Sequence, residues 1–557
     1  MQSIAENKGK SAIVTSALPY ANGEIHLGHI ASTYLPADIF TRFSRLLGRE
    51  VYHICATDDF GTPVLIRAEK ENKTPMEYVD EWNKRDYQDF KSIDISFDFF
   101  SKTSSKENIE LVQYIFKKLY DNGHIYEKDV IQFYCQIDKK YLPDRYVVGR
   151  CPYCNAENQY SDLCENCGRV PDQILDPKCG ICGADPIKKN SIHYFFKLSD
   201  FARQLRFWLT NNHNLQPDVK NYVINWIDEG LHDWDITRDI SWGVSIPLPD
   251  AKGKVLYGWF DNHICYISSF KAFFQAQNRD GRRFWNESEI FHFIGKDIVY
   301  HHYLFLPAVR MGINQEYKLP DYIPTRGHLL LHDRKISKSR DWYISLREFT
   351  SSFNPDYLRF YLASITPYSQ GDANFDWDVF RDKINNELIS NVGNFINRTL
   401  TFIAKSFNSK VPSPSEFGPD DQASIREIGR IADEVGAFLS NNEFDKGLKR
   451  ILAFSTYFNQ FFQKKMPWSD SESARATLYI SVNAVWSIGI ILEPFIPTSS
   501  EKIWVQLGMQ SSVHKEKWNS ASRFNLNPGH ALGNVGPIFQ RIETKDIELR
   551  KFDFEKH

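Results

Sequence analysis

An alternation of apolar strands and an amphipathic helix near the start of the chain constrains its fold more than any other feature. Residues Ala12–Ser16 form a short apolar run, a helical pattern follows from about His29 to Leu47, and a second apolar run spans Val51–Ala56. Strand, helix and strand in this order predict a βαβ unit, whose two strands lie parallel in one sheet. Such sheets bind their ligands beyond the carboxyl ends of the strands. The loop after Ser16 is therefore a candidate for a binding site.

Later segments divide the chain further, because 557 residues exceed what a single hydrophobic core holds. From about Tyr120 to Asp239 the chain is rich in Cys, Gly, Pro and Asp, which indicates an inserted domain. The α/β pattern then resumes, with strand candidates at Glu289–Ile294 and Tyr322–Leu331. Beyond Trp377, apolar residues recur every three or four positions, which predicts an all-helical region.

Composition narrows the class of protein only a little. Hydrophobic residues at 42% and charged residues at 25% are typical of a globular protein, and the net charge of -3 indicates no particular partner. The N-terminal Met1–Lys10 lacks the apolar core of a signal peptide. The most apolar late stretch, Val485–Leu492, is too short to span a bilayer and is predicted to be a buried helix. We therefore expect a cytoplasmic protein with no membrane partner.

Six of the nine cysteines form three Cys-x-x-Cys pairs, which in a chain without a secretion signal favour metal ligands over disulfides. Two of these pairs supply the four thiolates of a closed, structural Zn²⁺ site: Cys151, Cys154, Cys164 and Cys167. The alternative is four reduced, buried cysteines. The third pair matches an upstream Cys-x-x-Asp, so a second ion could be held by Cys135, Asp138, Cys179 and Cys182. The alternative there is a decayed site with three free cysteines.

Two short motifs carry the candidate catalytic chemistry. His26-Leu27-Gly28-His29 follows the first strand and opens the first helix, whose N-terminus attracts phosphate. Lys335-Ile336-Ser337-Lys338-Ser339 supplies two cations in a small polar loop, which can follow the charge of a triphosphate as pyrophosphate leaves. Alone, the first motif is equally consistent with two surface histidines, and the second is more often a solvated basic loop.

Together and in this order, the two motifs resemble the HIGH and KMSKS signatures of class I aminoacyl-tRNA synthetases. Four further stretches narrow the resemblance to the methionyl-tRNA synthetase family: Ala17–Gly23, Leu142–Arg145, Trp234–Asp239 and Phe293–Ile298. The resemblance implies that ATP, accompanied by Mg²⁺, activates methionine to an aminoacyl adenylate, which is then transferred to tRNA, here tRNA(Met). It covers nearly the whole chain.

The resemblance also assigns site residues by their match to family positions. ATP would be bound by His26, His29, Lys335, Lys338, Gly295, Asp297 and Arg238. The amino-acid pocket would be formed by Asp58, as the partner of the substrate ammonium group, and by Leu18, Tyr20, Trp259, Asn262, His263, Tyr266, Ile298 and His302. The anticodon would be read by Asn394, Arg398 and Trp468, since an unstacked base needs a flat side chain and edge hydrogen bonds. Without the resemblance, core packing or solvated polar side chains would explain many of these residues equally well.

The pocket departs from the family at Asn262 and His263, where small or apolar residues are usual. Polar groups in an apolar pocket cost free energy unless they are hydrogen-bonded. If they point inward, they select a substrate with a polar side chain; if they point outward, methionine remains the substrate. The sequence leaves open a paralogous synthetase that activates a methionine analogue or another amino acid and, more remotely, a tRNA-binding protein without catalysis.

The sequence thus predicts an α/β fold: a Rossmann-type parallel-sheet catalytic domain, an inserted zinc-knuckle domain and a C-terminal all-α anticodon-binding bundle. We expect the catalytic domain in 1–120 and 240–330 and the connective insertion in 121–239. A KMSKS-loop and stem-contact region would span 331–385, and the helical domain 386–557. Because the chain ends soon after that domain, we expect a monomer.

Overall fold

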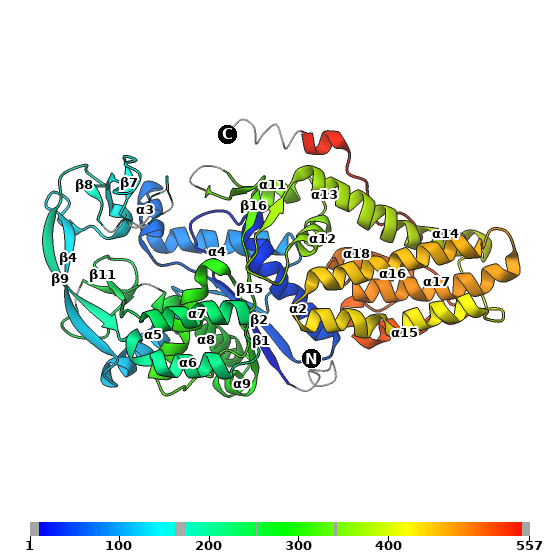
Figure 1. Cartoon of the computed structure of the whole chain (residues 1–557), viewed down its shortest axis with the longest axis horizontal. Helices are drawn as coiled ribbons and strands as arrows, with labels where there is room; N and C mark the ends of the chain where they lie inside the picture. Colours follow the sequence, from blue (N-terminus) through cyan, green and yellow to red (C-terminus); the bar gives the residue numbers. More distant parts are fainter. Residues whose placement is uncertain are drawn as a thin grey trace.

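A five-stranded parallel sheet lies at the centre of the molecule (Figure 1). The computed structural model describes residues 10–548, apart from 162, 163, 165, 168, 170, 172, 252, 258 and 339–341. In sheet order the strands are β15 (Thr325–Arg326), β14 (Glu289–Gly295), β1 (Ala12–Ser16), β2 (Val51–Thr57) and β3 (Phe99–Lys102). All neighbours pair in parallel, which confirms the predicted βαβ unit. The order reverses between β1 and β14, and parallel sheets bind ligands at such a point.

Helices cover both faces of this sheet. On one face, Phe40 of α2 (Leu35–Leu46) packs 4.5 Å from the ring of Phe291 in β14. On the other face, Tyr52 of β2 packs against aromatic rings of α8 (Phe260–Gln275). The predicted first helix starts as α1 (Leu27–His29) and passes through a π-helical turn before α2. Pro36 lacks the N–H that a regular turn would use there, which explains the wider turn.

The inserted segment projects from one end of the molecule, at the left of Figure 1. Its backbone is a long antiparallel ribbon of β4 (Ile125–Cys135) and β9 (Ile187–Phe196). A small sheet follows, in the order β7 (Gln159–Tyr160), β6 (Val147–Arg150) and β8 (Leu175–Cys179). Two helices then return the chain to the centre, α6 (Ala202–Asn211) and α7 (Pro217–Glu229), and their buried leucines and valines join the main core.

The single strand expected at Tyr322–Leu331 is wrong, because the chain leaves the central sheet there. It forms β15 and then β16 (Leu329–Leu331), which lies between β17 (Arg334–Lys335) and β18 (Ala373–Phe375). The change occurs at Gly327, where a Cβ atom would lie 2.1 Å from the carbonyl oxygen of Gly371. Only glycine permits so close an approach of two backbones.

The C-terminal part is all-helical, as predicted, and forms the right half of Figure 1. After α12 (Pro355–Ile365) and α13 (Trp377–Lys383), its helices are α14 (Asn394–Ser406), α15 (Pro419–Ser440), α16 (Phe444–Lys465), α17 (Ser471–Ile491) and α18 (Pro497–Gln506). The apolar part of α17 is longer than the expected Val485–Leu492. Ala474–Ile491 is long and apolar enough to cross a membrane, but 89% of it is buried inside the protein, which is typical of a core helix.

Buried ion pairs join this helical part to the catalytic sheet. Arg359 of α12 contacts Asp38 of α2 at 2.7 Å, and both side chains are 0% exposed. Arg42 of α2 contacts Asp38 at 2.8 Å and reaches Glu493, just after α17, at 2.9 Å. Because α2 continues the helix that His26-Leu27-Gly28-His29 opens, the helical part is anchored to the helix that leads away from the first motif.

Candidate functional site

The two sequence motifs, some three hundred residues apart in the chain, meet in space. The backbone N–H of Leu27 donates to Ile344 O at 3.2 Å, and that of Leu346 donates to Ile25 O at 2.9 Å. These bonds tie the loop after β1 to the segment that follows the second motif. Ser339, the last residue of that motif, lies outside the described residues.

A cavity of about 410 Å³ lies where the motifs meet, at the carboxyl ends of β1 and β14. Its walls include the predicted residues Leu18, Tyr20, His26, His29, Trp259, Gly295, Asp297, Ile298 and Lys335. Residues that the sequence did not single out complete the walls, among them Ser32, Thr33 and His328. Predicted ATP-binding and amino-acid positions therefore share one cavity at the point where the strand order reverses.

The two histidines of the first motif form a stacked pair. Their rings lie 3.6 Å apart at 18°, and the Nδ1 of His29 accepts from the backbone N–H of His26 at 3.3 Å. Burial, and then Lys338, lowers the pKa of His26 to about 3, and burial lowers that of His29 well below its usual value. Both rings are thus neutral and can offer an N–H to an anion. A Cβ at Gly28 would lie 3.1 Å from the His26 ring, which explains the glycine.

The two lysines of the second motif approach the same cavity. Lys335 is exposed and lines it. Lys338 is half-buried, and its Nζ lies 3.6 Å from the position that a Cβ of Gly23 would take. Burial lowers the pKa of Lys338 to about 8. This lysine therefore gives up its proton more readily than an exposed one.

We expect kcat/KM for ATP to fall as pH rises through about 8, because Lys338 must keep its proton to bind phosphate oxygens. Below that pH the group is charged, and above it the charge is lost. A pH profile of ATP–pyrophosphate exchange between about pH 6.5 and about pH 9.5 measures this. The matched control is Lys338→Arg, whose guanidinium keeps its proton and should remove the fall. A flat profile for the unaltered protein would contradict the prediction.

Asp58 lies at the end of β2, beside the loop of the first motif. Its backbone N–H donates to Pro19 O at 2.7 Å, and its carbonyl accepts from Ala21 at 2.9 Å. Its carboxylate accepts from the Nδ2 of Asn262 at 2.8 Å. Burial, and then Asp261, raises the pKa of Asp58 well above its usual range. A buried carboxylate in this state gains from a cationic partner such as an ammonium group.

The remaining predicted pocket residues lie deeper, next to Trp259. Four of them are buried and are not among the described residues that line the cavity: Asn262, His263, Tyr266 and His302. Tyr266 and His302 share a hydrogen bond of 3.0 Å, and the other ring nitrogen of His302 lies 3.0 Å from Ile298 O. Asn262 and His263 are buried inside the protein behind Trp259, so whether they meet the substrate side chain stays a prediction.

Among the described residues that line this cavity, Arg238 is absent, although the sequence predicted it there. Its guanidinium lies 4.7 Å from the ring of Tyr257 and 3.3 Å from Asp235. Sequence reasoning also missed His301, whose ring stacks on Trp259 at 4.4 Å. In the sequence, only the position of His301 directly before the predicted pocket residue His302 pointed to it.

The three residues matched to anticodon reading come together on the helical part. The guanidinium of Arg398 lies 6.0 Å from the ring of Trp468, which is 50% exposed. Asn394 and Arg398 are one turn apart on α14, and each contacts α16, through Asn459 and Gln463 at 3.3 Å. An exposed indole beside a guanidinium and amides is the equipment that single-stranded bases require.

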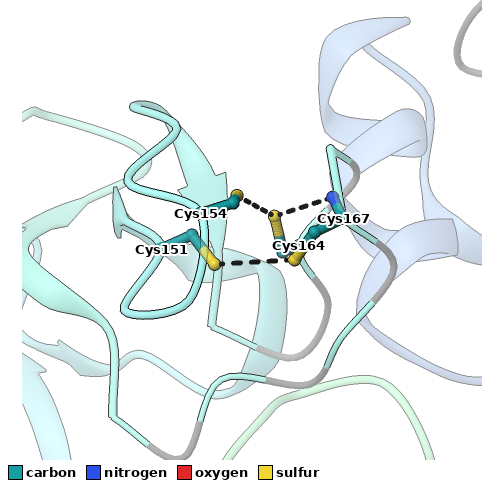
Figure 2. A group of neighbouring side chains, drawn as sticks. All are labelled: Cys151, Cys154, Cys164 and Cys167. Atoms are coloured by element: carbon teal, nitrogen blue, oxygen red, sulfur yellow. Dashed lines mark hydrogen bonds between the residues drawn. The ribbon is translucent and has the colours of Figure 1, made fainter.

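Both predicted metal-ligand sets are assembled in the inserted segment. The four sulfur atoms of Cys151, Cys154, Cys164 and Cys167 face one another (Figure 2), with 3.8 Å from Cys151 to Cys167 and 3.6 Å from Cys154 to Cys164. Tetrahedral zinc with bonds of about 2.3 Å separates its sulfur ligands by about 3.8 Å, so this set fits. In the second set, Cys135, Asp138, Cys179 and Cys182 also gather their ligand atoms within 4.8 Å of one another. The Asp138 carboxylate takes the fourth position.

Comparison with known proteins places the chain in a family. The family described as "tRNA synthetases class I (M)" matches residues 12–400, and the "Anticodon binding domain of methionyl tRNA ligase" matches residues 411–555. The chain belongs to the methionyl class I tRNA synthetases. This synthetase is 40% identical over 550 residues to the methionine–tRNA ligase of Methanopyrus kandleri, covering 97% of this chain and 81% of that protein. It is 41% identical to that of Pyrococcus horikoshii, covering 96% and 76%.

A solved structure has the same fold as the synthetase. Methionyl-tRNA synthetase of Mycobacterium tuberculosis, bound by methionyl-adenylate, superposes with a TM-score of 0.79 at 24% identity. The match covers 95% of this chain and 100% of that one. The expected combination of a parallel-sheet domain and a C-terminal helical domain is therefore confirmed.

Proposed function

We propose that this synthetase activates methionine with ATP and transfers it to tRNA(Met). The observation that carries the proposal is the meeting of the two motifs at one cavity, beside Asp58. Relatives named methionine–tRNA ligase, similar over nearly the whole chain, support the choice of amino acid.

The first step needs positioning and charge stabilisation more than a protein nucleophile. The methionine carboxylate attacks the α-phosphate in line, an O–P bond to the amino acid forms, and the bond to pyrophosphate breaks. The neutral rings of His26 and His29 would donate N–H groups to phosphate oxygens, while Lys335 and Lys338 would hold the departing pyrophosphate. Gly295 and Asp297 would border the adenosine, with Arg238 near the insertion. Mg²⁺ that accompanies ATP would neutralise phosphate charge.

Amino-acid-dependent ATP–pyrophosphate exchange with the full chain tests the proposal. Exchange driven by methionine, followed by charging of tRNA(Met), is the expected result. Exchange driven only by an unrelated amino acid would reject methionine. No exchange with any amino acid, together with tRNA binding, would instead identify a binding protein without catalysis.

We further propose that Asn394, Arg398 and Trp468 contact the anticodon. Trp468→Ala should raise KM for tRNA about 30-fold, since loss of one base stack costs on the order of 2 kcal/mol. ATP–pyrophosphate exchange should stay unchanged, because the indole lies on the helical part, away from the cavity. Aminoacylation at varied tRNA concentration measures both. The control is Trp226→Ala, a tryptophan of α7; an equal rise in KM there would contradict a specific role.

Zinc is proposed for both metal-ligand sets, in a structural role. The full chain should hold about two zinc ions, and Cys164→Ser should remove about one of them, because a closed site needs its four ligands. Elemental analysis and limited proteolysis of the insertion measure the loss. Ser191→Ala, in β9 outside both sets, should keep both ions. If the protein bound one zinc ion both with and without Cys164→Ser, zinc at the four-cysteine set would be contradicted. Asp138→Ala tests the other set separately, because it should remove only the ion held there.

The domain roles stay predictions of the same proposal: catalysis in 1–120 and 240–330, the insertion in 121–239, stem contact in 331–385 and anticodon binding in 386–557. A monomeric state and a cytoplasmic location are proposed with them. Light scattering and cell fractionation test these two points.

A further inference from the structure

Four histidines pack together beyond Trp259, and we call them the histidine cluster: His263, His292, His301 and His302. The His263 ring lies 4.7 Å from that of His302 and 6.0 Å from that of His301. His263 is only 4% exposed. Such a concentration of ring nitrogens inside a protein calls for an account of their hydrogen bonds.

The cluster divides into two kinds of histidine. His302 uses both ring nitrogens, on Tyr266 and on Ile298 O, and His292 uses both, on Thr15 and Arg310. By contrast, neither ring nitrogen of His263 or of His301 has a hydrogen-bond partner among the described residues. Hydrogen bonds within the protein therefore satisfy the rings of His302 and His292 and leave those of His263 and His301 unsatisfied.

The two unpaired rings are neutral. Burial, and then the other histidines, lowers the pKa of His263 well below its usual value, and burial lowers that of His301 to about 3. Each ring then offers one N–H donor and one acceptor. A buried polar atom without a partner costs free energy, so these atoms gain from a ligand group that can pair with them.

The position of the two rings relates them to the amino-acid pocket. His263 follows Asn262 on α8, and the Nδ2 of Asn262 donates to the carboxylate of Asp58, the expected ammonium partner. His301 stacks on Trp259, whose indole lines the cavity. Trp259 has a φ of 71°, a strained value for a residue with a side chain, at the start of α8. A substrate side chain that displaces this indole would meet the two imidazoles.

The positive charge beside the histidine cluster favours a substrate side chain that carries a hydrogen-bond acceptor. Arg310 is buried behind His292, and its Nη1 donates to Lys318 O at 2.8 Å. Among the described residues, Arg310 forms no ion pair with a carboxylate. The positive charge of Arg310 contributes to the lowered pKa of His263. The pocket is thus acidic at Asp58 and electropositive at the histidine cluster.

We propose that His263 and His301 form a hydrogen-bonding end of the amino-acid pocket, through which the enzyme activates amino acids of methionine's length whose side chain carries an oxygen acceptor, such as methionine sulfoxide. This inference rests on the proposed synthetase activity. An imidazole N–H donates to the substrate oxygen, and the sulfur of methionine, itself a weak acceptor, takes the same place.

ATP–pyrophosphate exchange with methionine, methionine sulfoxide and norleucine tests the proposal on the unaltered protein. Norleucine matches the length of methionine but has no acceptor. We expect kcat/KM for the sulfoxide to exceed that for norleucine by about tenfold, the effect of one hydrogen bond. Norleucine preferred over the sulfoxide overturns the inference while methionine exchange keeps the proposed function. Absence of exchange with methionine as well would reject the proposed function instead.

Variants assign the effect to the two rings. His263→Leu and His301→Leu should each lower the sulfoxide-to-norleucine ratio by about tenfold, whereas His263→Gln, which keeps a donor, should retain most of it. A ratio is insensitive to partial unfolding, because that would reduce both rates together. His124→Leu, in the turn before β4, is the matched control and should leave the ratio unchanged. An unchanged ratio in both leucine variants would overturn the assignment.

Discussion

Lys338→Ala is expected to lower kcat/KM for methionine-dependent ATP–pyrophosphate exchange by about 100- to 1000-fold, the usual cost of removing one group that stabilises transition-state charge. The lysine lies beside Gly23 and the stacked histidines, where the leaving pyrophosphate would gather its charge. Because the group should act mainly in the transition state, kcat should fall more than KM for methionine rises. Steady-state exchange at varied ATP and methionine separates the two constants.

The control for this variant is Arg334→Ala in the same loop. Arg334 is exposed and lies over the ring of Trp342, 5.3 Å from its centre, outside the described cavity lining. Its loss should change the rate by less than about threefold, in line with surface substitutions elsewhere. Equal losses in the two variants would mean that loop structure, and not the Lys338 charge, limits the reaction. Thermal unfolding of both proteins checks that each remains folded.

Asp58→Asn should reduce kcat/KM for methionine by about 100-fold, mostly through KM. A buried carboxylate that pairs with the substrate ammonium is worth about 3 kcal/mol, and asparagine keeps the shape without the charge. The carboxylate already accepts from Asn262, so the variant also faces two amides toward each other. KM for ATP should change little. Exchange kinetics at saturating ATP give the result.

Asp59→Asn is the matched control, one position along the chain. Its carboxylate accepts from the hydroxyl of Ser104 at 2.5 Å, so its loss should affect stability more than methionine binding. If both variants raise KM for methionine equally, the acidic surroundings as a whole, and not Asp58, would bind the ammonium group. A rise confined to Asp59→Asn would reject the assignment of Asp58.

The parts of the fold that local pattern determines could be predicted from the sequence. Strands β1, β2 and β14 are short apolar runs bounded by turns, and the structure places them within a residue of their expected ends. The π-helical turn before α2 was not predicted, since it depends on how Pro36 meets the sheet. The hydrophobic pattern also could not predict that the expected Tyr322–Leu331 strand divides in two. The division depends on the close contact of Gly327 with Gly371, which lie far apart in sequence.

The site shows the same division between local and long-range information. Motif spacing identified His26, His29 and Lys338, but only folding brings Lys338 next to Gly23. On the helical part, the four-residue spacing of Asn394 and Arg398 was visible in the sequence. Their partners on α16, which lie 65 residues further on, were not, because helix pairing is set by packing and leaves no local signal.

The ion pairs between α2 and the helical part limit how freely this enzyme can be divided. Arg42 depends on Glu493, and Arg359 donates to the carbonyl oxygens of Pro494 and Phe495, all supplied from beyond α17. Removing the bundle would strip these guanidinium groups of partners that burial makes necessary. Gene fusions, split-protein reporters or recombination between homologues should therefore keep α2, α12 and the segment after α17 from a single parent.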